Sequence, residues 1–124
     1  MNDLAILQLA DALARHSARR HGLIAENVAH ADTPGYKARD LERFETLVPR
    51  EGDIRATRQG HLSGQTRRTL RPVFDSAFGS EGPNGNTVSM TDQLARAAQA
   101  LGNHDKAVTV YKKTLDILRL GLGR

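Results

Sequence analysis

Two stretches of the chain repeat apolar or small residues at alternating spacings of three and four positions. One covers residues 4–31 and the other covers residues 90–122. This heptad spacing is typical of helices that pack lengthwise on other helices. It predicts a mainly α fold in which long N- and C-terminal helices pack as a coiled-coil-like layer. The predicted helix-seam interface consists of Leu7, Ala14, His21, Ile24, Val28, Leu94, Leu101, Val108, Tyr111, Leu115 and Leu118.

The chain between these two helices has a different composition. From residue 50 to residue 86 the apolar periodicity is lost, and glycine, arginine, serine and glutamine recur. Such a composition predicts an extended or flexible segment, with short extended pieces at 54–57 and 69–74. The expected parts are an N-terminal helix (1–31), a turn and short packed segment (32–49), an extended or irregular Gly- and Arg-rich middle (50–86) and a C-terminal helix (87–124).

Local signals mark where the two helices end and begin. Thr33 precedes a proline, which disfavours the helical conformation and ends the first helix near residue 31. Pro34 and Gly35 fit the two central positions of a type II turn, because proline presets one φ and glycine accepts the positive one. Ser89 can cap the second helix, with Asp92 three residues later as in a capping box.

The apolar content of the two seams is low for a pair of helices. Many seam positions hold alanine, and Ser17, His21 and His104 place polar groups in the same lines. Ordering the backbone costs roughly 1–2 kcal/mol per residue, which a single alanine-rich seam can hardly offset. We therefore expect other chains, identical or related, to supply the missing apolar burial.

The composition narrows the possible function classes. The chain has no cysteine, which excludes disulfides and thiolate metal sites, and its formal net charge is +4. No apolar run approaches the ~20 residues needed to span a bilayer, and we expect no cleavable secretory signal because the N-terminus lacks a basic segment. The basic charge comes without helix-turn-helix spacing, interleaved aromatic residues or zinc-ligand spacing, so nucleic-acid binding is not favoured.

The histidines do not predict a metal or catalytic site. His16 and His21 are five residues apart, which does not place them on one helical face as paired ligands. Motifs for nucleophilic catalysis, phosphate binding or dinucleotide binding are absent, so we predict no catalytic residue, metal or cofactor. His21 and His104 fall on seam positions instead. We hypothesise that a seam histidine makes assembly pH-sensitive, since protonation at about pH 6–7 would place charge in the interface.

The segment from residue 27 to residue 41 reads NVAHADTPGYKARDL. It closely resembles the segment that closes the N-terminal helix in bacterial flagellar rod and hook proteins, and residues 37–41 are most similar to the proximal rod proteins of that family. Residues 85–88 resemble the start of the family's C-terminal helix. His30 stands where the family usually has asparagine. The assembly motif that this resemblance indicates is Asn27, Ala29, Ala31, Asp32, Thr33, Pro34, Gly35 and Tyr36.

The resemblance implies a non-enzymatic, structural subunit of the flagellar basal-body rod, which is the drive shaft of the flagellum. In such proteins the terminal helices form the inner layer of the rod. The implied partners are copies of the same chain, other rod proteins, the basal-body adaptor and the export apparatus. The implied location is the periplasmic part of the basal body, reached through the flagellar type III exporter without a cleaved signal peptide.

An alternative from a different class is a small dimeric helical adaptor or regulator. Such a protein would dimerise through its seams and use its basic face to bind nucleic acid or an acidic partner. Retention on a DNA column that weakens steeply with added salt would favour it.

Overall fold

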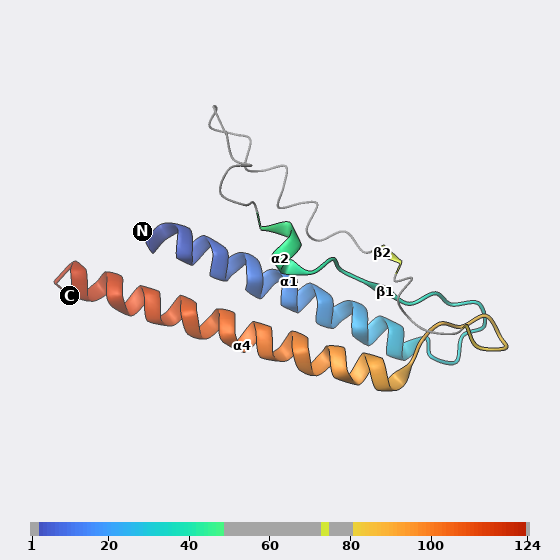
Figure 1. Cartoon of the computed structure of the whole chain (residues 1–124). Coiled ribbons are helices and arrows are strands. Elements are labelled where there is room, and N and C mark those ends of the chain that lie inside the picture. The colour runs from blue at the N-terminus through green and yellow to red at the C-terminus, as the bar shows by residue number, and fades with distance from the viewer. Residues whose placement is uncertain (1–2, 49–72, 75–80, 124) are drawn as a thin grey trace, which may run out of the picture.

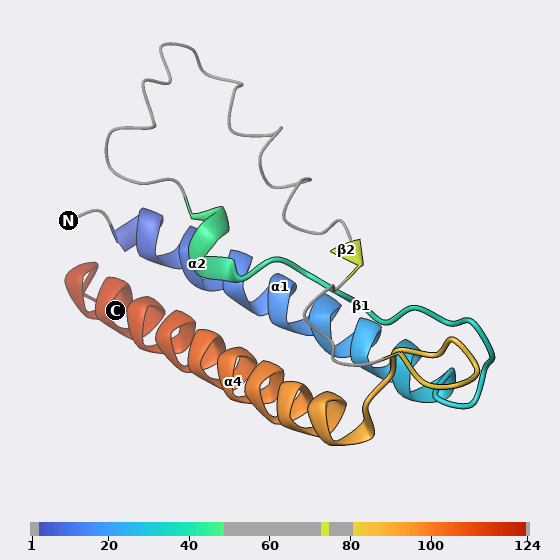
Figure 2. The same cartoon turned by 45° about the vertical axis from the view of Figure 1, so that its right-hand side comes forward.

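The protein is built around two long helices that lie side by side. A computed structural model describes residues 3–48, 73–74 and 81–123 (Figure 1). Helix α1 covers Asp3–Ala29 and helix α4 covers Met90–Gly121. They run antiparallel, so that the two termini of the chain lie at the same end of the hairpin in both views (Figures 1 and 2). This arrangement confirms the predicted mainly α fold with long terminal helices.

The ends of both helices follow from local chemistry. The Ser89 hydroxyl accepts a hydrogen bond from the backbone N–H of Asp92 at 3.5 Å, which confirms the predicted N-cap of α4. The backbone N–H groups of Leu122 and Gly123 donate to the last carbonyls of α4, and Gly123 has a positive φ of 72°. Glycine accepts this left-handed conformation without steric cost, as is usual at helix C-termini.

The interior of the hairpin is lined by small and polar side chains. On α1 the buried residues at heptad spacing are Ala10, Ser17 and Ile24. On α4 every buried residue is seven positions from the next, and the set is Gln93, Ala100, Ala107 and Thr114. The hydroxyl groups of Ser17 and Thr114 donate to carbonyls within their own helices, so their burial leaves no hydrogen bond unmade. Small side chains at these positions let the two helices approach closely.

The predicted seam residues lie beside this buried line. The structure buries Ile24, leaves Leu7, Ala14, Val108, Leu115 and Leu118 half-buried, and exposes His21, Val28, Leu94, Leu101 and Tyr111. The exposed fraction reaches 65% for Leu94 and 57% for Leu101. Their proposed role as an interface with other chains stays a prediction.

A second segment packs on another face of α1. It contains strand β1 (Arg39–Asp40) and the single-turn helix α2 (Phe44–Leu47). Strand β1 pairs antiparallel with β2 (Val73–Phe74), with Arg39 opposite Phe74 and Asp40 opposite Val73. Ala38 and Leu41 of this segment are buried, as is Leu23 of α1.

Two predictions concern the middle of the chain. The extended piece expected at 54–57 lies outside the described residues, as does most of the segment 50–86. Of the piece expected at 69–74, the described part is β2. In the described part of the chain, neither long helix contains a stretch apolar enough to cross a bilayer.

Candidate functional site

The segment that follows α1 forms a tight turn at residues 33–36. The backbone N–H of Tyr36 donates to the carbonyl of Thr33 at 3.3 Å, and Gly35 has a φ of 74°. A positive φ at the third residue of a turn, directly after a proline at the second, is the signature of a type II turn. The turn predicted from Pro34 and Gly35 is therefore confirmed.

This turn is held by the loop that precedes α4. The Gly35 N–H donates to the Asn84 carbonyl at 2.8 Å, and the Thr87 N–H donates to the Tyr36 carbonyl at 3.1 Å. The Thr87 hydroxyl accepts from the Ala38 N–H at 2.8 Å. The two motifs of the family resemblance, which are about fifty residues apart in the sequence, therefore pair through their backbones. We call residues 27–38 and 84–88 together the joint.

Asn86 binds the chain just beyond α1. Its side-chain amide contacts the carbonyl oxygens of His30, Ala31 and Thr33 at 2.8, 3.0 and 2.8 Å. The His30 and Thr33 carbonyls also accept from the backbone N–H groups of Thr33 and Tyr36, at 3.0 and 3.3 Å. The Asn86 carbonyl oxygen of the side chain accepts from the Val88 N–H at 2.8 Å. A buried residue of the C-terminal motif thus binds the turn that directly follows the N-terminal helix.

His30, the departure from the family pattern, has its own contacts. Its ring stacks on Tyr36 with a centroid distance of 4.6 Å and an interplanar angle of 7°. Its Nδ1 lies 2.8 Å from the Glu26 carbonyl, to which it donates. An imidazole at this position therefore fixes the Tyr36 ring over the end of α1.

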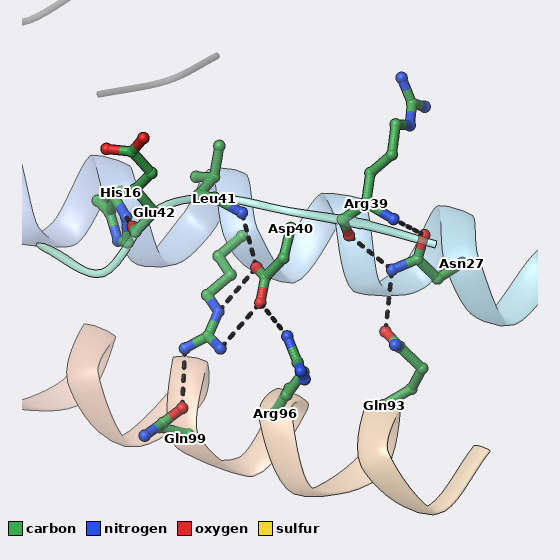
Figure 3. Close-up of polar contacts among 10 residues, drawn as sticks. His16, Asn27, Arg39, Asp40, Leu41, Glu42, Gln93, Arg96 and Gln99 are labelled. Carbon is green, nitrogen blue, oxygen red and sulfur yellow. Dashed lines mark hydrogen bonds and ion pairs between the residues drawn. The ribbon is translucent and has the colours of Figure 1, made fainter. Parts of the chain in front are cut away.

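The Asn27 side chain makes four hydrogen bonds, as many as that of Asn86, and Figure 3 draws those to Arg39 and Gln93. Its Oδ1 accepts from the Tyr36 hydroxyl and from the Arg39 N–H, both at 3.1 Å. Its Nδ2 donates to the Arg39 carbonyl at 2.8 Å and to Gln93 Oε1 at 3.1 Å. Both Asn27 and Gln93 are 0% exposed. This one amide links α1, the outgoing strand and the start of α4.

A charged cluster around Asp40 lies next to Asn27 (Figure 3). The Arg20 guanidinium binds the carboxylate in a bidentate manner, with Nε 3.0 Å from Oδ1 and Nη2 3.1 Å from Oδ2. Arg96 donates to Oδ2 at 2.6 Å, and the Leu41 N–H donates to Oδ1 at 2.8 Å. Arg20 also donates to Gln99 at 2.9 Å. The carboxylate of β1 therefore bridges α1 and α4.

Two effects act on the protonation of this carboxylate. Burial alone would raise the pKa of Asp40, since the charged form loses solvation. The hydrogen bond and charge of Arg20, followed by the Leu41 N–H and Arg96, outweigh that effect and hold the pKa of Asp40 below its usual 3.8. The cluster is therefore a carboxylate paired with two arginines at neutral pH.

His16 anchors the short helix α2 to α1. Its Nε2 donates to the Glu42 carbonyl at 2.7 Å, and its ring lies 5.5 Å from the Phe44 ring. The imidazole is buried, with 4% of the residue exposed. This histidine therefore has a structural contact.

Another face of the hairpin carries a groove with two hollows between α1 and α4. The first hollow, of about 270 Å³, is lined by Ser17, Ala18, His21, Ala100, Leu101 and His104. The second, of about 220 Å³, is lined by Ala10, Ala14, Ala107, Val108 and Tyr111, together with the charged Asp11 and Lys112. The structure thus brings the two seam histidines, His21 and His104, to one hollow. Their effect on assembly stays a prediction.

Some residues of the predicted assembly motif make contacts in the structure, and others are exposed. Asn27, Thr33, Gly35 and Tyr36 make the contacts of the joint, whereas Ala29, Asp32 and Pro34 are exposed. Their role in assembly stays a prediction. No sequence pattern marked five further residues that take part in these contacts, which are Arg20, Asp40, Asn86, Gln93 and Arg96. Thr87 and Asn86 were within the second motif, which was the only signal that could have found them.

The chemistry of these residues is that of a structural connection. Within residues 3–48, 73–74 and 81–123, no group of three or more His, Asp or Glu side chains is placed to hold a metal ion. The buried polar groups of the joint face one another, and the groove is mostly apolar. Such an arrangement can fix the angle at which the chain leaves α1 and can present helical surfaces to other molecules.

Comparison with known proteins gives one informative similarity. The chain is 23% identical over 118 residues to the flagellar basal body rod protein FlgB of Agrobacterium fabrum. The alignment covers 90% of this chain and 88% of that protein. No protein-family model matches the chain. The similarity is distant but extends over nearly the full length, and it supports the resemblance to flagellar rod proteins.

Proposed function

We propose that this chain is a structural subunit of the flagellar basal-body rod, and that it corresponds to the proximal rod protein FlgB. In this role it has no enzymatic activity. It assembles through α1 and α4 with itself and with other rod proteins to form the drive shaft. The similarity to FlgB of Agrobacterium fabrum supports the family assignment.

One observation carries the assembly role, which is the apolar surface that the hairpin leaves exposed. Mostly small residues, with Ile24 and Gln93, fill the contact between α1 and α4, while the heptad leucines Leu94 and Leu101 are 65% and 57% exposed. Large apolar residues left exposed at heptad spacing indicate a surface that another protein covers. In a rod, neighbouring helices would cover it.

The joint has a separate role in this proposal. Its turn reverses the chain at a fixed angle, so that the segment with β1 and α2 runs back along another face of α1 (Figure 1). The bonds from Asn86 and Asn27 hold that angle from two sides. Assembly of many copies in register requires each copy to direct this segment in the same way.

The remaining parts of the proposal come from the resemblance. The further partners are the basal-body adaptor and the export apparatus. The location is the periplasmic part of the basal body, and the chain reaches it through type III export without a cleaved signal peptide. We expect an epitope-tagged copy of the chain to co-purify with isolated basal bodies.

Substitution of the turn tests the assignment. The double variant Pro34→Ala with Gly35→Val removes the preset φ and forces a β-branched residue to a φ of 74°. We expect the variant chain to keep its helical circular dichroism but to be absent from basal bodies, in a source bacterium whose own copy is deleted. Swimming would then be lost.

A matched control is Gly22→Val. Gly22 is exposed in α1, and a Cβ built there has no neighbour within 4 Å. This variant should restore swimming to the deletion strain. Normal motility of the turn variant would contradict the proposed role of the joint.

A further inference from the structure

The loop that precedes α4 contains the one Asn-Gly pair of the chain, which is Asn84 and Gly85. Asparagine is a chemically labile residue, because the backbone nitrogen of the next residue can attack its side-chain amide carbon. Glycine in the next position favours this attack, since it has no Cβ to obstruct it. Asn84 is also exposed. The pair is therefore a candidate for deamidation.

The reaction at this pair requires water and no other reagent. The Gly85 nitrogen bonds to Cγ of Asn84, its proton passes to the side-chain amide nitrogen, and the bond from Cγ to that nitrogen breaks to release ammonia. Water then opens the cyclic imide at one of its two carbonyl carbons. Opening at Cγ gives aspartate at residue 84. Opening at the backbone carbonyl carbon gives isoaspartate, in which the main chain runs through Cβ and Cγ.

The folded loop restrains the nitrogen that would attack. The Gly85 N–H donates to the Gly82 carbonyl at 2.9 Å, and the Gly82 N–H donates to the Asn86 carbonyl at 2.9 Å. The attacking nitrogen must lose its proton, and a hydrogen bond made by the neutral N–H disfavours that loss. The two bonds also fix the backbone on both sides of Gly85. Attack on Asn84 therefore requires the loop to open.

Contacts with the rest of the joint keep this loop closed. The Asn84 backbone carbonyl accepts from the Gly35 N–H at 2.8 Å, and the Gly85 carbonyl accepts from Lys37 Nζ at 2.9 Å. Asn84 Oδ1 accepts from the Asn86 N–H at 3.2 Å. This last bond polarises the side-chain amide and by itself favours attack on it. Protection therefore depends on the restrained nitrogen rather than on the side chain.

From these contacts we infer that Asn84 is a deamidation site that the joint keeps closed, and that its isoaspartyl product cannot rebuild the joint. Isoaspartate lengthens the main chain before Gly85, where a Cβ would already lie 3.3 Å from the Gly35 Cα. Aspartate keeps the main-chain length and the Oδ1 acceptor, so it fits. The loss of intact chains should follow the time spent unfolded. The inference does not depend on a role in the rod.

Mass spectrometry of the purified full-length chain tests the first half of this inference. Native and guanidinium-unfolded samples are incubated at neutral pH, and peptide mapping follows Asn84 and Asn103 in each. Asn103 precedes His104 and is the internal reference, so Asn84 should react faster than Asn103 in the unfolded chain. In the native chain Asn84 should react at least about tenfold slower than in the unfolded chain, because only the opened loop reacts.

Two variants separate the chemistry of the pair from its protection. Gly85→Ala should slow the reaction in the unfolded chain, because its methyl group obstructs the attack. Gly35→Val leaves residues 84 and 85 intact but places a β-branched residue at a φ of 74° in the joint. Its reaction in native buffer should approach the unfolded rate.

Three results would overturn the first half of the inference. Native wild type could react at Asn84 as fast as the unfolded chain, or the unfolded chain could react faster at Asn103 than at Asn84. The third result is a Gly35→Val chain that reacts as slowly as the native wild type.

The second half is tested by comparing the two products. Chain that carries isoaspartate at residue 84 is separated by chromatography after incubation in denaturant and is then refolded. It should unfold at a lower urea concentration than the Asn84→Asp variant, because only isoaspartate lengthens the main chain. Equal urea midpoints would overturn the second half.

Discussion

The two ends of the helical hairpin are built in opposite ways. At the loop end, the polar groups of Asn27, Asn86 and Thr87 are matched to partners within the chain. At the end that holds the termini, small residues face inward while Leu120 and Leu122 are each 77% exposed. Directional hydrogen bonds hold the first end, where Gln93 Nε2 is the buried polar atom of the described residues that lacks a partner, whereas the second end leaves large apolar side chains exposed.

This contrast assigns different tasks to the two kinds of interaction. Hydrogen bonds demand particular distances and angles, so they specify one exit path for the chain. Apolar contact is non-directional and can be supplied by any helix with the right spacing. The joint should therefore determine the stability of the single chain, and the exposed apolar residues of the helices should determine its assembly.

The largest expected effect on stability comes from Asn27→Ala. The variant removes four hydrogen bonds and leaves the Tyr36 hydroxyl, the Arg39 backbone and Gln93 Oε1 without their partner. We expect the free energy of unfolding to fall by about 2–4 kcal/mol, since buried polar groups lose their bonds. Urea unfolding followed by circular dichroism measures it.

Asn103→Ala is the control variant, because it also removes a side-chain amide but at a position outside the joint. Asn103 lies half-buried on α4, where alanine is the better helix former. Its variant should be at least as stable as the wild type. An equal loss in both variants would show that Asn27 has no special place in the fold.

The next largest effect should come from Asp40→Asn. The side chains of Arg20 and Arg96 are 15% and 22% exposed, and the substitution leaves both beside a neutral amide. We expect a loss of about 2 kcal/mol at pH 7, less than for a fully buried pair because solvent reaches both arginines. Urea unfolding at neutral pH provides the measurement.

The same variant should change the response to acid. The pKa of Asp40 is lowered in the folded chain relative to its usual 3.8. Its contribution to stability is therefore complete above that usual value and is lost as the pH falls through the lowered folded pKa. The stability difference between wild type and Asp40→Asn should shrink below about pH 4. Parallel acid unfolding profiles would contradict the pairing.

Two glycines should respond to alanine in opposite directions. Gly85 in the joint has a φ of 79°, and an added Cβ would lie 3.3 Å from the Gly35 Cα. Gly85→Ala should destabilise the chain by about 1–2 kcal/mol. Gly102 lies within α4 with open space around it, so Gly102→Ala should stabilise by about 1 kcal/mol. Thermal unfolding of the two variants tests the pair, and equal signs would refute it.

The smallest effect on the single chain should come from the exposed leucines. Leu101→Ser should change the free energy of unfolding by about 0.5 kcal/mol or less, because the side chain is 57% exposed. Leu23→Ala is the contrasting variant, because Leu23 is 1% exposed and its loss should cost about 2–4 kcal/mol. If urea unfolding shows a large loss of unfolding free energy for Leu101→Ser, the exposed leucines stabilise the monomer itself.

The sequence was sufficient to predict the two helices, the cap at Ser89 and the turn at Pro34. Each of these depends on neighbouring residues and on a periodicity that spans many turns. The buried line of α4 could not be predicted in the same way. Ala107 and Thr114 carry almost no hydrophobic signal, so the heptad pattern pointed to the larger side chains next to them.

The contacts of the joint were predicted only in part. The family resemblance drew attention to Asn27, but the partners of its amide come from segments distant in the sequence. Asp40 looked like an ordinary surface carboxylate, since nothing local shows that Arg20 and Arg96 converge on it. Such clusters depend on tertiary placement, which no spacing within one helix encodes.

The amide contacts of Asn86 have a consequence for the order in which the chain can fold. During synthesis or passage through a narrow channel, residues emerge from the N-terminus first. Until residue 86 emerges, the carbonyls of His30, Ala31 and Thr33 lack the amide that binds them. The turn that follows α1 therefore becomes fixed only after most of the polypeptide has appeared, which delays commitment to the final shape until both helices can meet.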